Sequence, residues 1–357
     1  MNMNLEVQKP DAGKAAGTTV NGPYGELVLL FYDGFEIKAR PGRWGKLYSN
    51  TRSVARTAYR YAKGVQINTG FYTAFQLLER ALHRAGCDVR VNDFNLAMQN
   101  PRYPIGLAGY PSVLENVRLP NPIIFGPGDY GYPDEVVSRI KGLDIRKLIQ
   151  PSDWAAGLYY PDQWGCRTRM MVWPVGIDTE AYPDISGYPK TIDFLIYDKI
   201  RWNRDVVVPA LLDDVVARLE AANLSFQILR YGEHKHSDFM SGLRQSRALL
   251  FLCEHETQGL AYQEALASNI PVLAWDEGVL VDPRQREFLT DDLVISAVPY
   301  FDSRCGEKFK RDEFPRVLKE FLSKRGSYQP RQYISETLSL ARSADTYLKA
   351  YRELKTD

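Results

Sequence analysis

The segment RALLFLCEHETQGLAYQEALASNIPVLAWD, residues 247–276, contains the pattern that decides the fold. Its continuous apolar run, RALLFLCE, predicts a buried parallel strand, and LAYQEALAS and IPVLAWD predict the helix and the strand that follow. Such a unit is expected to stay apolar, yet it contains Glu254, Glu256 and Glu264. Because a carboxylate buried without partners is strongly destabilising, these glutamates must reach solvent, a partner or a ligand.

The same alternation of strand and helix extends back to residue 191. The runs are TIDFLIYD, RDVVVPALLDDVVARLEAANL, SFQILRYG and HSDFMSGLRQS. Short β-rich runs that alternate with amphipathic helical runs are typical of a parallel sheet with helices on both faces. The second half is therefore predicted to be a Rossmann-like α/β domain, with Glu254 and Glu256 at or just past the carboxyl end of a buried strand. Ligands bind at that end.

The first half repeats this alternation less regularly. Its predicted elements include the strand GELVLLFYD, the helix TGFYTAFQLLERALHRAG and the strands DVRVNDF and NPIIFGPGD. Regular periodicity lapses at residues 173–190, where proline and glycine cluster. We expect a flexible tail at residues 1–22, an N-terminal Rossmann-like domain at 23–175 and a C-terminal one at 176–334. Two such domains face to face would hold a ligand between them.

Length and composition fit a two-domain globular protein. The chain has 357 residues, of which 45% are hydrophobic and 25% charged. Its 45 basic and 44 acidic residues give a net charge of +1, so nucleic acid is not an expected partner. The four cysteines are too far apart for the usual zinc site and are expected to be reduced thiols in a cytoplasmic protein. No run is long enough to span a membrane, and the N-terminus lacks a signal-peptide pattern.

A basic insertion, residues 34–69, interrupts the first half. Within SNTRSVARTAYRYAKG, Arg52, Arg56 and Arg60 recur at helical spacing after a Ser-Asn-Thr start, which predicts one basic stripe on a short helix. Charge runs of this kind are often just a solvated face. The alternative is contact with an anionic acceptor or membrane surface, which the interleaved aromatic residues would suit.

The turn before the helix LAYQEALAS predicts a phosphate site. The first N–H groups of a helix have no intrahelical partner, so those of Gly259 and Leu260 would point into the cleft and could bind a phosphate without a metal. His234 and His236, in YGEHKHSDF, follow a strand. They lack convincing acidic or cysteine partners for a metal site and are expected to line a nucleotide-base pocket.

The glutamate-containing segment resembles a known family. The string ETQGLAYQEALASNIPVLA, residues 256–274, is similar to the E-x7-E segment of retaining glycosyltransferases of family 4. The residues in register are Glu256, Gly259, Leu260, Glu264, Ala265, Ala267, Pro271 and Val272. A second string, RMMVWPVGIDTEAYPD, resembles the interdomain segment of that family. Its matching residues are Pro174, Gly176, Asp178 and Thr179.

This resemblance implies a GT-B fold, in which two Rossmann-like domains face each other across a cleft and the C-terminal one binds a nucleotide-sugar donor. It implies that Glu264 bonds the ribose hydroxyls and that Glu256 lies near the donor sugar. Lys199 and Arg201 would stabilise the diphosphate, although the family's Gly-Arg opening is absent before them. The other expected donor contacts are Gly259, Leu260, Thr257, Gln258, Tyr231, Gly70 and Arg204.

The resemblance also implies roles for the N-terminal domain, which would bind the acceptor. The family's histidine in this domain has no counterpart in FGPGDYGYPD, where Asp129 is either its substitute or a turn-forming residue. With Arg52, Arg56 and Arg60, it completes the set of acceptor or membrane candidates. Residues 335–357 would form a helix that packs back on the N-terminal domain.

The implied function is retaining transfer of a sugar from a nucleoside diphosphate sugar to a hydroxyl of a glycan, a glycolipid or a lipid-linked saccharide, as in polysaccharide biosynthesis. No nucleophile is evident, so the departing phosphate is expected to assist the incoming hydroxyl, with no metal or other cofactor required. The expected location is the cytoplasm, with peripheral contact at the inner membrane face as one option. Two alternatives stay open: a nucleotide-sugar epimerase, and a non-catalytic protein that binds nucleotide sugars or glycans on the same fold.

Overall fold

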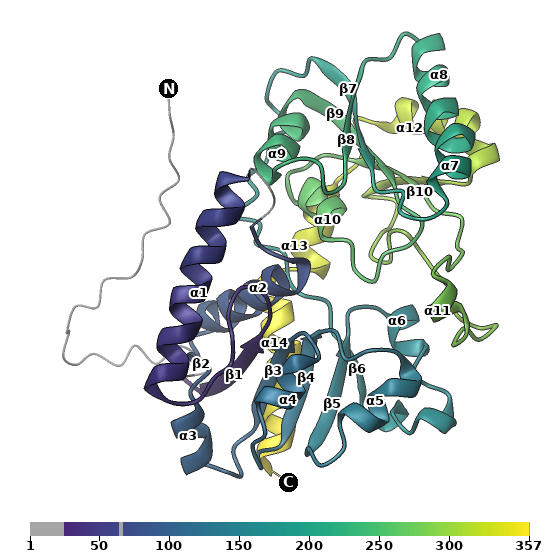
Figure 1. Ribbon diagram of the computed structural model, residues 1–357. Coiled ribbons are helices and arrows are strands. Elements are labelled where there is room, and N and C mark those ends of the chain that lie inside the picture. The colour runs from purple at the N-terminus through teal and green to yellow at the C-terminus, as the bar shows by residue number, and fades with distance from the viewer. Residues whose placement is uncertain (1–24, 64–66, 357) are drawn as a thin grey trace.

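The computed structural model describes residues 25–63 and 67–356. It contains two parallel β-sheets with helices packed on their faces (Figure 1). The N-terminal sheet lies in the lower half of Figure 1 and the C-terminal sheet in the upper half. The flexible tail expected at residues 1–22 lies outside the described residues.

The N-terminal sheet has six parallel strands in the order β2-β1-β3-β4-β5-β6. The strands are β1 (Leu27–Asp33), β2 (Asp88–Val91), β3 (Ile105–Gly109), β4 (Ile123–Gly128), β5 (Ile145–Gln150) and β6 (Met170–Val172). The helices of this half are α1 (Gly42–Ala62), α2 (Gly70–Arg84), α3 (Phe94–Gln99), α4 (Ser112–Asn116), α5 (Pro133–Arg139) and α6 (Asp153–Gly157). The apolar run of β1 is buried from its second residue onward, as a parallel strand covered on both faces requires.

The C-terminal sheet has five parallel strands in the order β11-β10-β9-β7-β8. The strands are β7 (Ile192–Asp198), β8 (Phe226–Arg230), β9 (Ser246–Leu252), β10 (Val272–Trp275) and β11 (Gly306–Phe309). The helices are α7 (Arg204–Val207), α8 (Asp213–Ala221), α9 (His236–Gln245), α10 (Leu260–Ala267), α11 (Pro283–Arg286), α12 (Phe314–Lys324), α13 (Pro330–Thr337) and α14 (Leu340–Thr356).

The strand order of the C-terminal sheet reverses between β7 and β9. β8 follows β7 on one side, whereas β9, β10 and β11 follow on the other. The last residues of the two strands, Asp198 and Leu252, are paired in register. The loops that leave them therefore start side by side, and the N–H of Lys199 donates to the carbonyl of Leu252 at 2.8 Å. Such a reversal point is where ligands bind in open parallel sheets.

The last helix of the chain, α14, belongs to the core of the N-terminal half. It packs against α2, and in Figure 1 this yellow helix lies behind the strands of the lower sheet. Tyr347 and Tyr351 are fully buried there. The hydroxyl of Tyr351 accepts a hydrogen bond from the N–H of Leu29, in the middle of β1. α14 therefore ties the end of the chain to the first sheet, while the exact domain bounds stay a prediction.

Three local features differ from the sequence-based expectations. α1 begins at Gly42 and is a long helix, whereas the Ser-Asn-Thr triplet predicted a later start; the two glycines of its first turn, Gly42 and Gly45, weaken the helical signal. The strands β3 and β11 are short and were not expected. The C-terminal helical stretch is broken between α13 and α14, where Ser339 forms a β-bridge with Ile177 of the interdomain segment.

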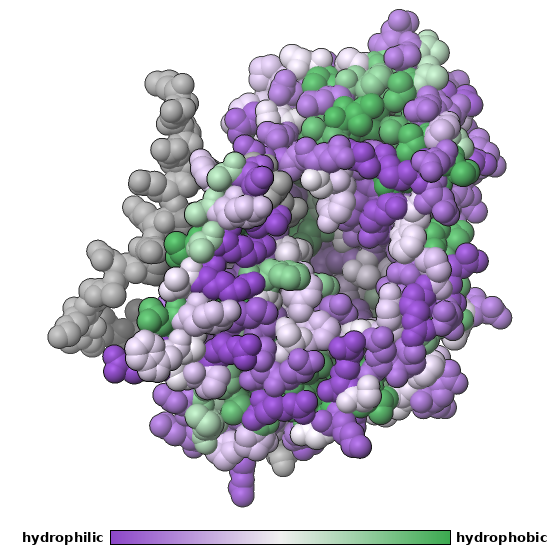
Figure 2. All heavy atoms as spheres, viewed as in Figure 1, coloured by the Kyte–Doolittle hydropathy of each residue, from purple (hydrophilic) through white to green (hydrophobic). Residues whose placement is uncertain are grey.

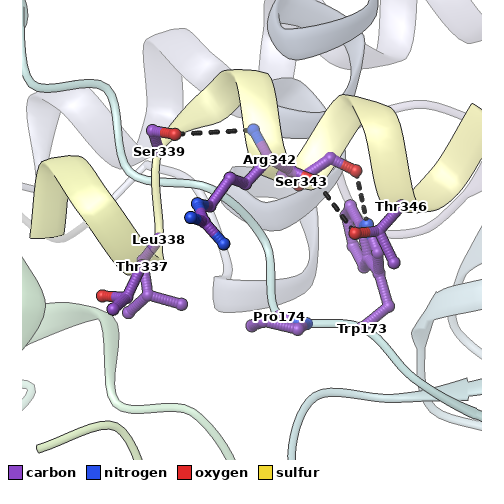
Figure 3. Close-up of a pocket in the computed structure, with 8 residues that line it drawn as sticks. All are labelled: Trp173, Pro174, Thr337, Leu338, Ser339, Arg342, Ser343 and Thr346. Carbon is purple, nitrogen blue, oxygen red and sulfur yellow. Dashed lines mark hydrogen bonds between the residues drawn. The ribbon is translucent and has the colours of Figure 1, made fainter.

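A small cavity lies where the interdomain segment meets α13 and α14 (Figure 3). Trp173 and Pro174 form one side, and the indole N–H of Trp173 donates to the carbonyl of Ser343 at 2.8 Å. The cavity measures about 110 Å³. Small-molecule sites usually need roughly 300 Å³ or more, so this cavity is not the site of a nucleotide sugar.

Candidate functional site

The loops after β7 and β9 bring an ion pair to the reversal point of the C-terminal sheet. The ammonium of Lys199 contacts a carboxylate oxygen of Glu256, and the two side chains are only 13% and 11% exposed. Burial lowers the pKa of Lys199, but the negative charge of Glu256 outweighs this and leaves it raised. Burial likewise raises the pKa of Glu256, but the charges of Lys199 and Arg201 leave it lowered. Both groups are therefore held in their charged forms.

A second glutamate fastens the same two loops together. One oxygen of Glu254 accepts hydrogen bonds from the backbone N–H groups of Arg201 and Trp202, at 2.8 and 2.9 Å. The guanidinium of Arg201 donates to the carbonyl of His255 at 2.7 Å, and its Nε lies 3.8 Å from Glu254. Sequence reasoning gave Glu254 no role. The sequence did indicate that Glu254 follows a buried strand, β9. Its partners could be identified only from the register in which β9 pairs with β7.

The first turn of α10 lies at the junction between the two halves. Leu260, the first residue of α10, packs against apolar core residues of both halves. Gly259 precedes it with a φ of 84°, and a Cβ there would lie 2.2 Å from the ring of Tyr262. Only glycine fits this left-handed, crowded position. The chain can therefore turn sharply from Glu256 into the helix and direct the first N–H groups of α10 toward the junction.

Glu264 lies one turn inside α10 and already has a partner. Its carboxylate is 2.9 Å from Nε2 of His236, at the start of α9. This hydrogen bond to Glu264 raises the pKa of His236. Sequence reasoning expected His236 near a nucleotide base but did not foresee this contact. Tyr231 lies close by, with its ring centroid 4.6 Å from the ammonium of Lys199.

Two of the expected donor contacts are engaged within the protein. The side-chain amide of Gln258 exchanges two hydrogen bonds with the backbone of Val175, at 3.0 and 2.8 Å, and so clasps the interdomain segment. The guanidinium of Arg204 forms a bidentate ion pair with the carboxylate of Asp198, at 2.9 and 2.7 Å. Thr257 is exposed. A donor that used the side chains of Gln258 or Arg204 would have to displace these bonds.

The candidates of the N-terminal half lie at the carboxyl edge of the other sheet. Gly70 begins α2, and a Cβ there would meet no atom within 4 Å. Asp129 is exposed and follows β4 directly. Its carboxylate accepts the N–H of Gly131 at 2.8 Å, which is the bond of a turn-forming aspartate. Of the two roles that the sequence allows for Asp129, this geometry is that of a turn-forming residue.

The arginines of the basic insertion are turned toward the domain. Arg52, Arg56 and Arg60 are half-buried. Arg52 donates to the carbonyl of Phe35 at 2.7 Å, and Arg56 donates to that of Ile67 at 2.8 Å. Two of the three therefore hold α1 against neighbouring loops.

Contacts between the halves surround the site. The indole N–H of Trp154, in α6, donates to the carbonyl of Glu256 at 3.0 Å. Asp178 of the interdomain segment accepts hydrogen bonds from Arg80 and Arg84 of α2, at 2.6 and 2.9 Å. Figure 2 shows the surface hollowed between the two halves. The charged groups of the C-terminal loops thus lie at an interdomain cleft.

No group of three or more His, Cys, Asp or Glu side chains in residues 25–63 and 67–356 could hold a metal ion. Over the same residues, no helix is long and apolar enough to span a bilayer.

Comparison with known proteins identifies the fold. No protein-family profile and no curated protein sequence matches this chain. A sucrose-phosphate synthase from Thermosynechococcus elongatus aligns with a TM-score of 0.55 at 10% identity and covers 92% of this chain and 99% of its own. A glycosyltransferase from Rickettsia africae ESF-5 aligns at 0.49 and 12% identity, over 93% of this chain and 99% of that one. The catalytic domain of starch synthase IV from Arabidopsis thaliana aligns at 0.48 and 10% identity, over 82% and 79%. The first likeness and the two facing parallel sheets show that the chain has the GT-B fold, which confirms the fold class expected from the sequence.

Proposed function

We propose that this protein is a glycosyltransferase that transfers a sugar from a nucleoside diphosphate sugar to an acceptor hydroxyl. The observation that carries the proposal is the group of charges at the reversal point of the C-terminal sheet. Lys199 and Arg201 face Glu256 there, directly before the first turn of α10. Two cations beside the free N–H groups of a helix match the charge of a diphosphate.

In the donor complex, the diphosphate takes the place of Glu256 as the main partner of Lys199. Arg201 contacts the same phosphates, while the N–H groups around Gly259 and Leu260 bind an oxygen at the start of α10. Glu264 accepts hydrogen bonds from the two ribose hydroxyls, which a carboxylate can do with both oxygens. Tyr231, Thr257 and Gly70 complete the donor site. These roles agree with the E-x7-E pattern of glycosyltransferase family 4, to which we assign the segment from Glu256 to Glu264.

We propose that transfer proceeds with retention and without a metal. As the glycosidic bond breaks, negative charge grows on the leaving phosphate, and Lys199 and Arg201 stabilise that charge more strongly in the transition state than in the ground state. The leaving phosphate oxygen then accepts the proton of the acceptor hydroxyl, which attacks the same face of the sugar. Glu256, released from Lys199, lies near the sugar and favours positive charge at its reacting carbon.

The N-terminal half supplies the acceptor side. Asp129 and Gly70 lie at the carboxyl edge of its sheet, and the acceptor is a glycan, a glycolipid or a lipid-linked saccharide, as in polysaccharide biosynthesis. The domain assignment is an acceptor domain at residues 23–175, a donor domain at 176–334 and a closing helix at 335–357. We place the protein in the cytoplasm, with peripheral contact at the inner membrane face.

A thermal-shift screen against a panel of nucleotide sugars tests the donor site. A ligand that binds only the folded state raises the melting temperature, so one donor class should stabilise the native chain and leave the Glu264→Ala variant unchanged. The stabilising donor is then incubated with candidate acceptors, and the anomeric configuration of the product is read by NMR. If no nucleotide sugar is bound, hydrolysed or transferred, the proposal is wrong. Binding without turnover would instead favour a non-catalytic nucleotide-sugar-binding protein, and an inverted product would exclude retention.

A further inference from the structure

The helix α1 has an unusual composition for a surface helix. Over Gly42–Ala62 it contains five basic residues and no acidic residue. It runs along one side of the N-terminal half, at the left of Figure 1. Within the part of the chain that the structure describes, it shares no extensive contact with another helix or strand. One long face of this positively charged helix is therefore open.

The face of α1 that touches the protein is polar. Ser49 is its only buried residue within the described part of the helix, and the hydroxyl of Ser49 accepts the N–H of Lys38 at 2.9 Å. Arg56, on the same side, donates to the carbonyl of Ile67 and lies 3.4 Å from Glu36. Hydrogen bonds and an ion pair, rather than an apolar stripe, hold α1 in place.

The opposite face carries large apolar side chains. Trp44, Leu47, Val54 and Tyr61 are spaced three or seven residues apart, which puts them on one side of the helix. Their exposed fractions are 83%, 56%, 71% and 78%. A surface helix of a globular protein normally turns such residues to the core and its arginines to water. α1 does the reverse, and several large apolar side chains exposed on one side of a helix mark an interaction surface.

The charge of α1 identifies the partner. Exposed Arg43 and Lys46 border the apolar face at its first turns, and Lys63 is exposed just beyond its end. A second copy of this helix would bring two sets of positive charges together, which opposes self-association. An anionic lipid surface satisfies both features, because its headgroups attract the lysines and arginines and its acyl boundary accepts the apolar side chains. Tryptophan and tyrosine are also the residues that favour the membrane–water boundary.

We propose that α1 docks the protein on an anionic membrane surface, with Trp44, Leu47, Val54 and Tyr61 inserted among the lipids. α1 contacts Glu36, which also accepts the N–H of Thr69 at 2.8 Å, directly before Gly70 and α2. The protein-facing side of the docked helix is thus bonded to the loop that begins the expected acceptor side. The inference of a membrane-binding surface depends only on the features of α1. Its use in reaching a lipid-linked acceptor rests on the proposed function.

Flotation of the full chain with vesicles tests this surface. Vesicles of phosphatidylcholine with phosphatidylglycerol should carry the protein, vesicles of phosphatidylcholine alone should carry at least about 10-fold less, and added salt should weaken binding. The triple variant Trp44→Ser, Leu47→Ser, Val54→Ser should lose about 10-fold or more of the binding, because each side chain no longer leaves water. The matched control is Val206→Ser with Val294→Ser, whose side chains are 70% and 84% exposed outside α1. It should bind like the native chain.

Each outcome of the experiment is decisive. Equal losses in the triple variant and the control, or no flotation with either vesicle, overturn the inference. A triple variant that floats normally does so as well. Sedimentation velocity without lipid reports the competing partner: a native dimer that the triple variant converts to a monomer would make α1 a self-association surface. Unchanged melting temperatures show that the variants fold. If the protein floats with the vesicles but turns over no nucleotide sugar, the membrane surface is supported and the proposed function is wrong. If it turns over a nucleotide sugar but does not float, only the proposed function is supported.

Discussion

Both sheets have acidic residues at the carboxyl edge, near the point where the strand order reverses, and use them differently. In the N-terminal sheet, Asp33 ends β1 beside the point where the strand order reverses, and it is fully buried. Its two oxygens accept hydrogen bonds from four groups, all in the same half of the chain. The donors are the side chains of Lys38, Ser112 and Asn116 and the N–H of Ala39. This carboxylate is saturated by permanent partners.

In the C-terminal sheet, Glu256 occupies the corresponding edge with more exchangeable partners. Its carboxylate contacts the ammonium of Lys199 and the thiol of Cys253, the latter at 3.2 Å. A lysine is a compact charge on a flexible stem, so it can turn from a carboxylate to a phosphate at small cost. The difference suggests that the first reversal point is locked by its own hydrogen bonds, whereas the second holds charges that a donor can take over. The following predictions test that contrast.

The largest expected effect is on turnover. Replacing Lys199 with alanine should lower kcat by about 100- to 1,000-fold, because the leaving phosphate loses one of its two cationic partners. Steady-state kinetics with the donor found by thermal shift measures it. Lys324→Ala is the matched control, since Lys324 pairs with Glu307 near the start of β11, at the opposite edge of the same sheet.

Loss of Lys199 alone also leaves the nearly buried carboxylate of Glu256 without its main partner. The double variant Lys199→Met, Glu256→Gln removes both charges together and should keep the native melting temperature, because a neutral pair of similar volume avoids an unpaired charge. It should remain inactive. Near-native turnover in this folded double variant would show that the charges of the second reversal point do not serve catalysis.

The next expected effect is on the stability of the fold and concerns Asp33, at the reversal point of the N-terminal sheet. Asp33→Ala leaves its donors without an acceptor in a buried place and should lower the free energy of unfolding by roughly 3 kcal/mol. Donor affinity of the folded variant should not change. Urea denaturation measures the first and calorimetric titration the second. Asp144→Ala is the control, because its pair with Arg146 is exposed and should cost less than about 1 kcal/mol. Equal losses of unfolding free energy in Asp33→Ala and Asp144→Ala would show that the hydrogen bonds of Asp33 do not lock this edge of the sheet.

A smaller effect is expected on donor binding. Glu264→Gln keeps the size of the side chain but loses the charge that would accept the ribose hydroxyls, and should raise the donor Kd by about 10-fold. Glu220→Gln, on the exposed side of α8, should leave the Kd unchanged. Isothermal titration distinguishes the two. If Glu264→Gln binds the donor like the native chain, the ribose lies elsewhere.

The main elements of the site could be predicted from the sequence because their signal is local. The run before Cys253 is apolar throughout, which fixes a buried strand, and the glutamates eight positions apart, Glu256 and Glu264, then fall beside its carboxyl end. Glu254 could not be assigned in this way. Its partners are the N–H groups of Arg201 and Trp202, and only the register of β7 against β9 brings them together.

The same limit explains the misjudged start of α1 and the missed strand β3. The strand β3, IGLAG, contains two glycines and only one β-branched residue, so it becomes recognisable as a strand only by its place between β1 and β4. In α1, the spacing of Arg52, Arg56 and Arg60 was visible, yet the direction in which they point depends on the carbonyl groups of distant loops. Helical spacing predicts a stripe, and the packing decides which side of the helix faces water.

The smallest expected effect concerns pH and the partner of Glu264. The hydrogen bond to Glu264 raises the pKa of His236, so the charged pair stabilises the fold fully below the ordinary histidine pKa of about 6.5 and is lost as the pH rises through the raised value. Because the imidazole is about 55% exposed, solvent screens the pair and the stability change should stay below about 1 kcal/mol. In the proposed donor complex, the ribose competes with His236 for this carboxylate. Donor affinity should therefore rise a few-fold as the pH increases through that range, and His236→Gln should abolish the dependence. An identical pH profile in His236→Gln would mean that the dependence does not come from the His236–Glu264 pair, and the idea that the donor takes over exchangeable partners at this edge would lose that support.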